Sequence, residues 1–282
     1  MSKPVVKTSC SFREMIEGKD TDTTVSPEFQ LEPVEVLMME MEDVLFHLDS
    51  AVMMPERPKG KSSSDGTEDD ATDPDDAKLQ EDQDKVSGLQ AIALALKQFE
   101  FDSQKRLLAA GHTDTSGAAK MNFELSALRA ENVLSLLEGS PYTFAGVSEK
   151  RHRIEDYQQI LMYVKDHRSW SDCDPVKIDD KWSDDVDKAN RAFIKRYNDW
   201  ATSPEGPGAD IDHPISEATA DKIKKDPKHK WPLEMWFAVY HIFDDDIAAA
   251  LQVDRWHLNR EYRSGLQFCD DNKKYIACGE SY

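Results

Sequence analysis

The chain has few positive charges and no long apolar run. It has 282 residues, of which 35 are Lys or Arg and 55 are Asp or Glu, giving a formal net charge of −20 at pH 7. Proteins that bind nucleic acids or anionic membranes need a basic surface, so this balance argues against both kinds of partner. No stretch approaches the ~18 consecutive apolar residues of a membrane span, and we expect no direct membrane insertion.

The first 20 residues, MSKPVVKTSCSFREMIEGKD, lack the apolar core of a secretory signal peptide. Cys10 is preceded by Lys7 and Thr8, where a lipoprotein signal needs an apolar run. We therefore expect neither kind of signal at this end of the sequence.

Cysteine and histidine are scarce and poorly spaced for chemistry. None of the four cysteines (Cys10, Cys173, Cys269 and Cys278) forms a CxxC pair, and no histidines have HExxH spacing. We predict unpaired thiols; the alternative is a Cys269–Cys278 bridge in an oxidising compartment. The acidic triplet Asp244–Asp246 is predicted to be a solvated helix start rather than a cation site. We thus expect no metal, no cofactor and no catalytic residues.

Three segments near the N-terminus differ in composition. Residues 1–30 are polar and form an extension that we expect to order only against a partner. Apolar residues alternate with others over 33–56, which predicts one or two strands. Residues 57–85 hold many acidic and almost no apolar residues, so they cannot offset their ordering entropy. We predict that this stretch is a disordered insertion.

Helical periodicity dominates the rest of the chain. Apolar residues at helical spacing predict helices over 86–101, 122–137, 152–167, 182–201 and 231–253. A short buried strand ending in a Gly-His-Thr-Asp turn is expected between the first two helices, and Gly139 and Pro141 are expected to end the second. The Pro/Gly-rich stretch 203–216 reads as a loop, and 266–282 as one or two strands. Strands alternating with helices are typical of a mixed α/β sandwich.

The stretch GHTDTSGAAKMNFELSALRAENVLSLL resembles the central signature of OmpA-like peptidoglycan-associated domains. The matching positions are Gly111, His112, Thr113, Asp114, Gly117, Asn122, Leu125, Ser126, Arg129 and Ala130. VLFHLDSAVMMPE resembles the opening strand and turn of the same family. The resemblance implies an α+β fold for residues 31–150, a βαβαβ sandwich of two helices on a mixed sheet. It also implies that residues 265–282 return to that sheet.

The resemblance also implies a ligand. In that family the turn aspartate and the helix arginine hold the free amino-acid end of diaminopimelate in the peptidoglycan stem peptide. Here these residues are Asp114 and Arg129; a carboxylate accepts from the ammonium group, and a guanidinium donates a fork to the carboxylate. The predicted ligand-binding set is Asp114, Arg129, Thr113, Thr115, Gly117, Asn122 and Ser126. A structural alternative stays open, in which Asp114 caps the turn and Arg129 pairs with it or with Glu124.

A second stretch, residues 171–198, is similar to the small three-helix peptidoglycan-binding modules found beside cell-wall hydrolases. The outline is kept by Asp174, Pro175, Ile178, Asp179, Ala189, Ala192 and Phe193. Asp180 and Ser183 stand where that family has turn glycines, which allow the backbone to approach a ligand closely. We therefore predict that residues 151–264 are a structural helical insertion rather than a second glycan site.

Two functions follow as hypotheses. The first is a non-catalytic peptidoglycan anchor, made in the cytoplasm and acting at the cell envelope, in the periplasm or in a secreted particle. The second is a structural component, with protein partners, of a contractile injection or phage-tail-like particle. The family's Asn-Arg-Arg turn has no counterpart before the sequence stops at ACGESY, so the sheet is expected to lack a strand or to receive one from a partner. A wall hydrolase is disfavoured because no catalytic spacing is present.

Overall fold

A computed structural model describes residues 45–56, 87–100, 105–113, 118–207 and 214–280, and the backbone of four short strands before residue 31. The chain divides into two compact units, Met1–Glu40 and Met41–Tyr282.

The first unit contains two antiparallel strand pairs. Strand β1 (Val5–Lys7) pairs with β4 (Glu28–Gln30), and β2 (Cys10–Ile16) pairs with β3 (Lys19–Val25). The register Ile16↔Lys19 leaves two residues between β2 and β3, a common hairpin connection. These strands lie in the N-terminal extension of residues 1–30, for which no strand was predicted. They were missed because their polar sequence lacks alternating apolar residues.

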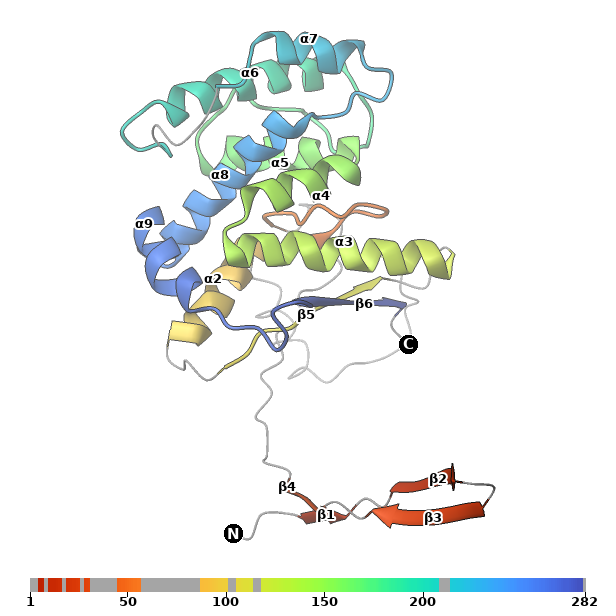
Figure 1. The fold of residues 1–282 in the computed structure, drawn as a ribbon. Helices are drawn as coiled ribbons and strands as arrows, with labels where there is room; N and C mark the ends of the chain where they lie inside the picture. The colour runs from red at the N-terminus through yellow and green to blue at the C-terminus, as the bar shows by residue number, and fades with distance from the viewer. Residues whose placement is uncertain are drawn as a thin grey trace, which may run out of the picture. The chain divides into compact units, whose positions relative to one another are not determined.

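In the second unit, a parallel strand pair packs against one long helix. Strand β5 (Ala109–Thr113) pairs with β6 (Tyr275–Glu280), and a bridge between Leu107 and Phe268 extends the pairing. Helix α3 (Ala119–Glu138) lies along both strands (Figure 1). Parallel strands need a long crossover connection, and here it contains α3 and every later helix.

Besides α3, the described part of the second unit contains further helical elements. They are α2 (Gly88–Glu100), α4 (Pro141–Lys150), α5 (Ile154–His167), α6 (Asp184–Ala201), α7 (Ala218–Lys225), α8 (Leu233–Ala250), α9 (Arg255–His257), the π-helical η3 (Leu258–Tyr262) and the 3₁₀-helical η4 (Arg263–Gly265). Figure 1 shows α4, α5 and α8 on the side of α3 away from the strands, with α6 and α7 furthest from them. None of the described helices is both long and apolar enough to cross a membrane.

The predicted fold class, α+β, is confirmed, as are all five predicted helices. Helices α4 and α7 were not predicted. Helix α3 ends before Gly139 and Pro141, as predicted, and Gly139 caps it with φ 76°. Pro141 also begins α4, in whose first turn a missing N–H costs nothing. Helix α7 has only eight residues and begins two residues after the Pro/Gly-rich loop.

The strand prediction over 33–56 fails in its described part. Residues 45–56 form no strand, and Asp49 has a left-handed backbone with φ 63°. This turn reverses the chain, and Met54 N donates back to Leu45 O at 2.7 Å. Residues 33–44 and the acidic stretch 57–85 lie outside the described residues.

The larger of two hydrophobic clusters among the described residues runs through both halves of the second unit. It joins Leu136 and Phe144, before residue 150, to Trp231 and Trp236, after it, and all four side chains are fully buried. No gap separates the helices of residues 151–264 from α3 and α4 in this core. We conclude that the helical insertion packs as part of the same body.

The prediction that the acidic triplet Asp244–Asp246 is a solvated helix start is wrong, because the triplet lies in the second half of α8. Asp244 forms a buried ion pair with Arg263 at 2.5 Å, and Asp246 accepts from Arg168 at 2.6 Å. In the described ranges no group of three or more His, Cys, Asp or Glu side chains is placed to hold a metal ion.

Candidate functional site

The site predicted from sequence begins where β5 ends. Gly111 lies under α3, and a Cβ atom there would come within 1.9 Å of Ser126 O, so the close approach of helix and strand requires glycine. Thr113 is buried, and its Oγ1 donates to Gly279 O at 3.3 Å. Asp114, Thr115 and Gly117 lie outside the described residues.

Ser126 connects α3 to the second strand. Its side chain is fully buried; Oγ donates to Phe123 O at 2.9 Å and accepts from Gly279 N at 3.0 Å. Gly279 has φ 67°, next to a register shift in the β5–β6 pairing. The polar atom of Ser126 therefore bonds to β6, whereas the prediction counted it among the ligand contacts.

Three described members of the predicted set lie on one buried face of α3. Asn122, Ser126 and Arg129 follow one another at spacings of four and three residues, which places side chains on the same side of a helix. Asn122 is 5% exposed and Arg129 is 7% exposed. The structure thus brings together residues that were predicted from the sequence.

Arg129 is held by the backbone of the 45–54 segment. Its Nε donates to Ser50 O at 3.1 Å, and its Nη2 donates to His47 O at 3.2 Å. The guanidinium carbon lies 4.9 Å from the ring centroid of Phe46, within cation–π range. Glu124, one partner considered for Arg129, instead lies 4.0 Å from Lys120. One edge of the guanidinium is thus engaged by two carbonyl oxygens.

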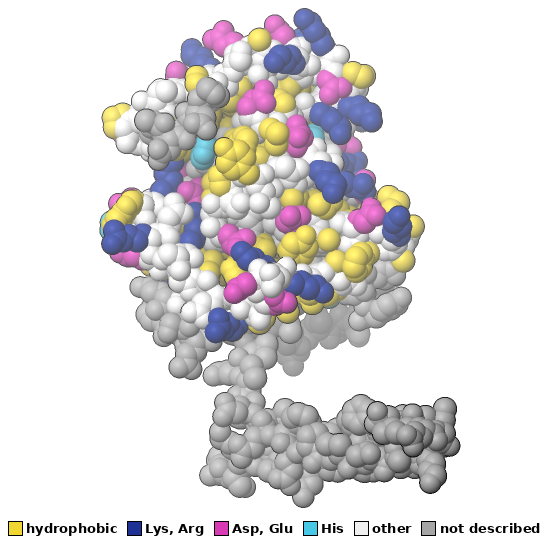
Figure 2. All heavy atoms as spheres, in the orientation of Figure 1, with side chains coloured by type: hydrophobic (Ala, Val, Ile, Leu, Met, Phe, Trp, Pro, Cys, Tyr) yellow, Lys and Arg dark blue, Asp and Glu magenta, His cyan; other side chains and the backbone are white. Residues whose placement is uncertain are grey.

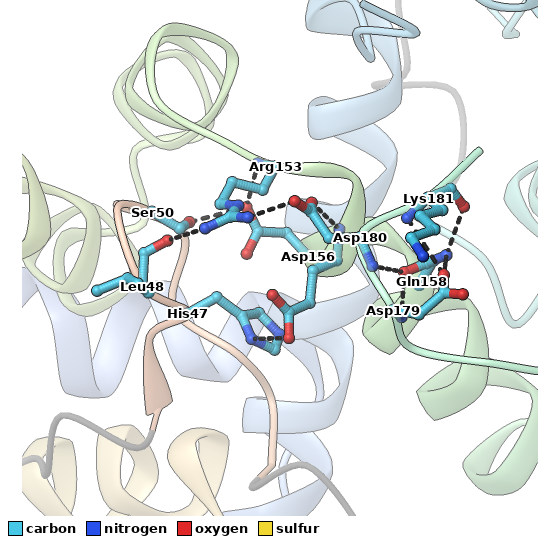
Figure 3. Close-up of polar contacts among 10 residues, drawn as sticks. His47, Leu48, Ser50, Arg153, Asp156, Gln158, Asp179, Asp180 and Lys181 are labelled. Atoms are coloured by element: carbon cyan, nitrogen blue, oxygen red, sulfur yellow. Dashed lines mark hydrogen bonds and ion pairs between the residues drawn. The ribbon is translucent and has the colours of Figure 1, made fainter.

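The 45–54 segment is bound in turn to the start of α5 (Figure 3). Ser50 Oγ donates to Asp156 Oδ2 at 2.8 Å, and that same oxygen accepts from Arg153 N at 2.7 Å. His47 Nδ1 lies 3.2 Å from Glu155 Oε1. Arg153 Nη1 donates to Leu48 O at 3.0 Å. These contacts join the segment that holds Arg129 to the helical insertion.

Asp156 is the buried charge of this network. It is fully buried, and its Oδ1 has no hydrogen-bond partner among the described residues. Burial raises the pKa of its carboxyl group to about 7, against the lowering effect of the hydrogen bonds from Arg153 N and Ser50. Asp156 was not predicted from the sequence. The available signal was an acidic residue four positions before Ile160, and hence on the apolar face of α5.

The second stretch that resembles a peptidoglycan-binding module docks on the same helix. Asp180, at a family glycine position, keeps a left-handed backbone with φ 59°. Its carboxylate pairs with Arg153 and accepts from Glu155 N. Gln158 Oε1 accepts from the backbone N–H groups of Asp179 and Asp180, both at 3.0 Å. Here the turn packs internally instead of lining an open groove.

A surface groove of about 600 Å³ lies between α4 and α7. Its lining includes Lys150, Lys222 and Lys230 together with Glu149 and Asp226, and none of the predicted site residues. Figure 2 shows Lys/Arg and Asp/Glu side chains interspersed over the described part of the face it draws.

Cys269 and Cys278 are exposed free thiols and Cys173 is a buried one, as predicted for these three.

Comparisons with protein-family models, curated proteins and solved structures found no match to this chain.

Proposed function

We propose that the chain is an OmpA-like, non-catalytic anchor that binds the diaminopimelate end of the peptidoglycan stem peptide. The OmpA-like sandwich and its ligand come from the resemblance of residues 111–130 to that family. The observation that carries the proposal is the shared buried face of Asn122, Ser126 and Arg129 on α3, the helix that packs against β5.

The chemistry required is recognition of a zwitterion. Arg129 donates from Nε and Nη2 to the carbonyl oxygens of Ser50 and His47, and a ligand carboxylate would be a further acceptor for its guanidinium. Asp114 supplies the negative partner for the ammonium group. Two charge-assisted contacts of about 1.5–3 kcal/mol each, together with backbone amides at the helix start, give roughly millimolar to micromolar affinity per stem peptide. Such weak, repeated contacts suit an anchor on a polymer.

The experiment is calorimetric titration of the full chain with a soluble muropeptide containing diaminopimelate. Arg129→Lys keeps the charge but loses the fork, so we expect its affinity to fall about 10- to 100-fold. Asp114→Asn should fall similarly. The matched control is Arg196→Ala. Arg196 lies on α6, where its exposed guanidinium pairs with Asp172, and this variant should bind like wild type. Equal affinities for wild type and both site variants would contradict the proposal.

The alternative is a structural component of a contractile injection or phage-tail-like particle that binds no peptidoglycan. The buried Arg129 favours it, because its two backbone acceptors already give the side chain a structural role. Under this alternative, wild type fails to bind muropeptide at millimolar concentration and co-sediments with assembled particles.

A further inference from the structure

We infer that Asp156 and Glu155, in the first turn of α5, are positioning residues for Arg129, acting through the turn formed by residues 47–50. This deepens the proposed function and rests on it, since Arg129 is the proposed carboxylate-binding group. It assigns the helical insertion a role in setting the geometry of a ligand site to which it contributes no direct contact.

The turn is the link between the two parts. Ser50 N donates to His47 O at 3.0 Å, and the same carbonyl oxygen accepts from Arg129 Nη2. Asp49, inside this turn, has the left-handed backbone that aspartate tolerates better than most residues. The carbonyl oxygens of His47 and Ser50, two of the groups that hold the guanidinium, therefore keep their positions as long as the turn does.

Every residue of the turn is bound to residues 151–156. His47 pairs with Glu155 at 3.2 Å, Leu48 O accepts from Arg153, Asp49 pairs with Arg151, and Ser50 donates to Asp156 at 2.8 Å. Ala51 N, just after the turn, donates to Arg151 O at 3.0 Å. Figure 3 shows His47, Leu48 and Ser50 facing Arg153 and Asp156.

The end of the 45–54 segment that follows the turn is fixed to α3 by contacts that do not involve α5. On α3, Asn132 Oδ1 accepts from Met53 N at 3.0 Å, and its Nδ2 donates to Ser148 Oγ at 3.1 Å. Helix α3 thus grips residue 53, whereas α5 grips residues 47–50. Removing the α5 contacts should release the turn locally while Met53 stays anchored, so that the acceptors of Arg129 lose their fixed positions.

The test follows the Nε–H of Arg129 in protein labelled with ¹⁵N-arginine, without ligand. Arg129→Lys identifies its signal. Hydrogen exchange at Nε should accelerate about tenfold or more in Asp156→Ala and Ser50→Ala, because a hydrogen bond worth ~1.4 kcal/mol is lost between the turn and α5. Asp156→Asn keeps an acceptor oxygen and should stay within about twofold of wild type.

The control is Asp246→Ala. Asp246 lies on α8, and its carboxylate accepts from Tyr163 and Arg168 at the opposite end of α5 from Asp156. This variant should leave exchange at Arg129 unchanged. Unchanged exchange in Asp156→Ala, or equal acceleration in Asp246→Ala, would overturn the inference.

A muropeptide titration of the same variants separates the two proposals. Loss of affinity in Asp156→Ala but not in Asp156→Asn supports both. If wild type does not bind while exchange follows the expected pattern, the proposed function fails and the positioning of Arg129 stands. If wild type and Asp156→Ala bind equally well, the positioning role in binding is wrong.

Discussion

At the scale of single residues, the GHTD signature has a packing explanation besides its proposed ligand. Gly111 is required because the Ser126 carbonyl would lie 1.9 Å from any Cβ atom. Ser126 bonds to β6 through Gly279. These two residues would keep the strands and α3 together whether or not a ligand binds. Only substitutions of Asp114 and Arg129 can therefore distinguish a peptidoglycan anchor from a structural component.

We predict that Gly111→Ala lowers the free energy of unfolding by about 1–3 kcal/mol, because helix and strand must separate to admit the methyl group. Urea unfolding would measure it. Gly146→Ala is the matched control. Apart from the backbone of α4 itself and the neighbouring residues, no atom lies within 4 Å of the place of the new methyl group, and the change should stabilise by roughly 0.5–1 kcal/mol. Equal effects of the two substitutions would contradict the packing explanation.

Asp156 makes a prediction about pH. Its pKa is about 7 in the folded protein because of burial, well above the usual 3.8, despite the nearby Arg153 and with Glu155 adding to the rise. A carboxyl group with a raised folded pKa binds its proton more tightly when folded. Its contribution to stability is therefore complete below pH ~4 and is lost as the pH rises towards 7.

Asp156→Asn removes this titration. The difference in unfolding free energy, wild type minus Asp156→Asn, should fall between pH 4 and 7 by at most about 1.4 kcal/mol per pH unit. It should level off above pH ~8. Paired urea titrations across this range would measure it, and a difference that rises or stays constant would show that burial does not control the carboxyl group.

At the scale of elements, amphipathic helices were predictable and the segment that completes the site was not. In α2, α3, α5, α6 and α8, the apolar stripe predicts both that the segment is a helix and which of its faces is buried. Residues 45–56 look like a strand by apolar alternation, but His47 and Ser50 need polar partners that α5 provides from more than 100 positions away. Periodicity carries no information about such distant contacts. The sequence therefore revealed the face that carries Arg129 but not the turn that holds it.

The exit of the insertion is fixed by another buried arginine. Arg263 in η4 pairs with Asp244 of α8 at 2.5 Å, and its Nη2 donates to Leu136 O of α3 at 2.7 Å. Both charged side chains are less than a tenth exposed. This contact joins α8, η4 and the end of α3 just before the chain returns to β6.

Arg263→Met should cost about 3–5 kcal/mol, because it leaves the Asp244 charge buried without its partner. The double variant Arg263→Met/Asp244→Leu should recover part of that loss. Urea unfolding of the single and double variants would test this. Arg196→Ala, which breaks an exposed pair, should cost at most ~1 kcal/mol. A similar cost for both arginines would mean that burial of the pair is unimportant.

At the scale of the whole molecule, the two regions that the sequence divides at residue 150 share one core. Trp231 and Trp236 belong to the same cluster as Leu136 and Phe144. The division at residue 150 came from a resemblance, and neither resemblance nor local composition reports which apolar faces meet. This shared core packs α5 and the end of α3 in one body.

The described part of the second unit should therefore unfold in one cooperative transition. All six tryptophans lie between residues 170 and 256, so their fluorescence reports on the insertion. Amide exchange in β5 reports on the strand pair. We expect both probes to give the same urea midpoint. Two separated midpoints would show that the insertion unfolds independently, and this would contradict the inference that α5 positions Arg129.

The most direct test of the central claim is an NMR titration of the labelled chain with diaminopimelate muropeptide. We predict saturable shifts at the Thr113 and Asn122 amides and at Arg129 Nε–H, with no response at Lys222 and Lys230 in the groove beside α7. A muropeptide whose diaminopimelate carboxylate is amidated should cause none of these shifts. Identical shifts with both ligands, or no shift at Arg129 at millimolar concentration, would contradict peptidoglycan recognition.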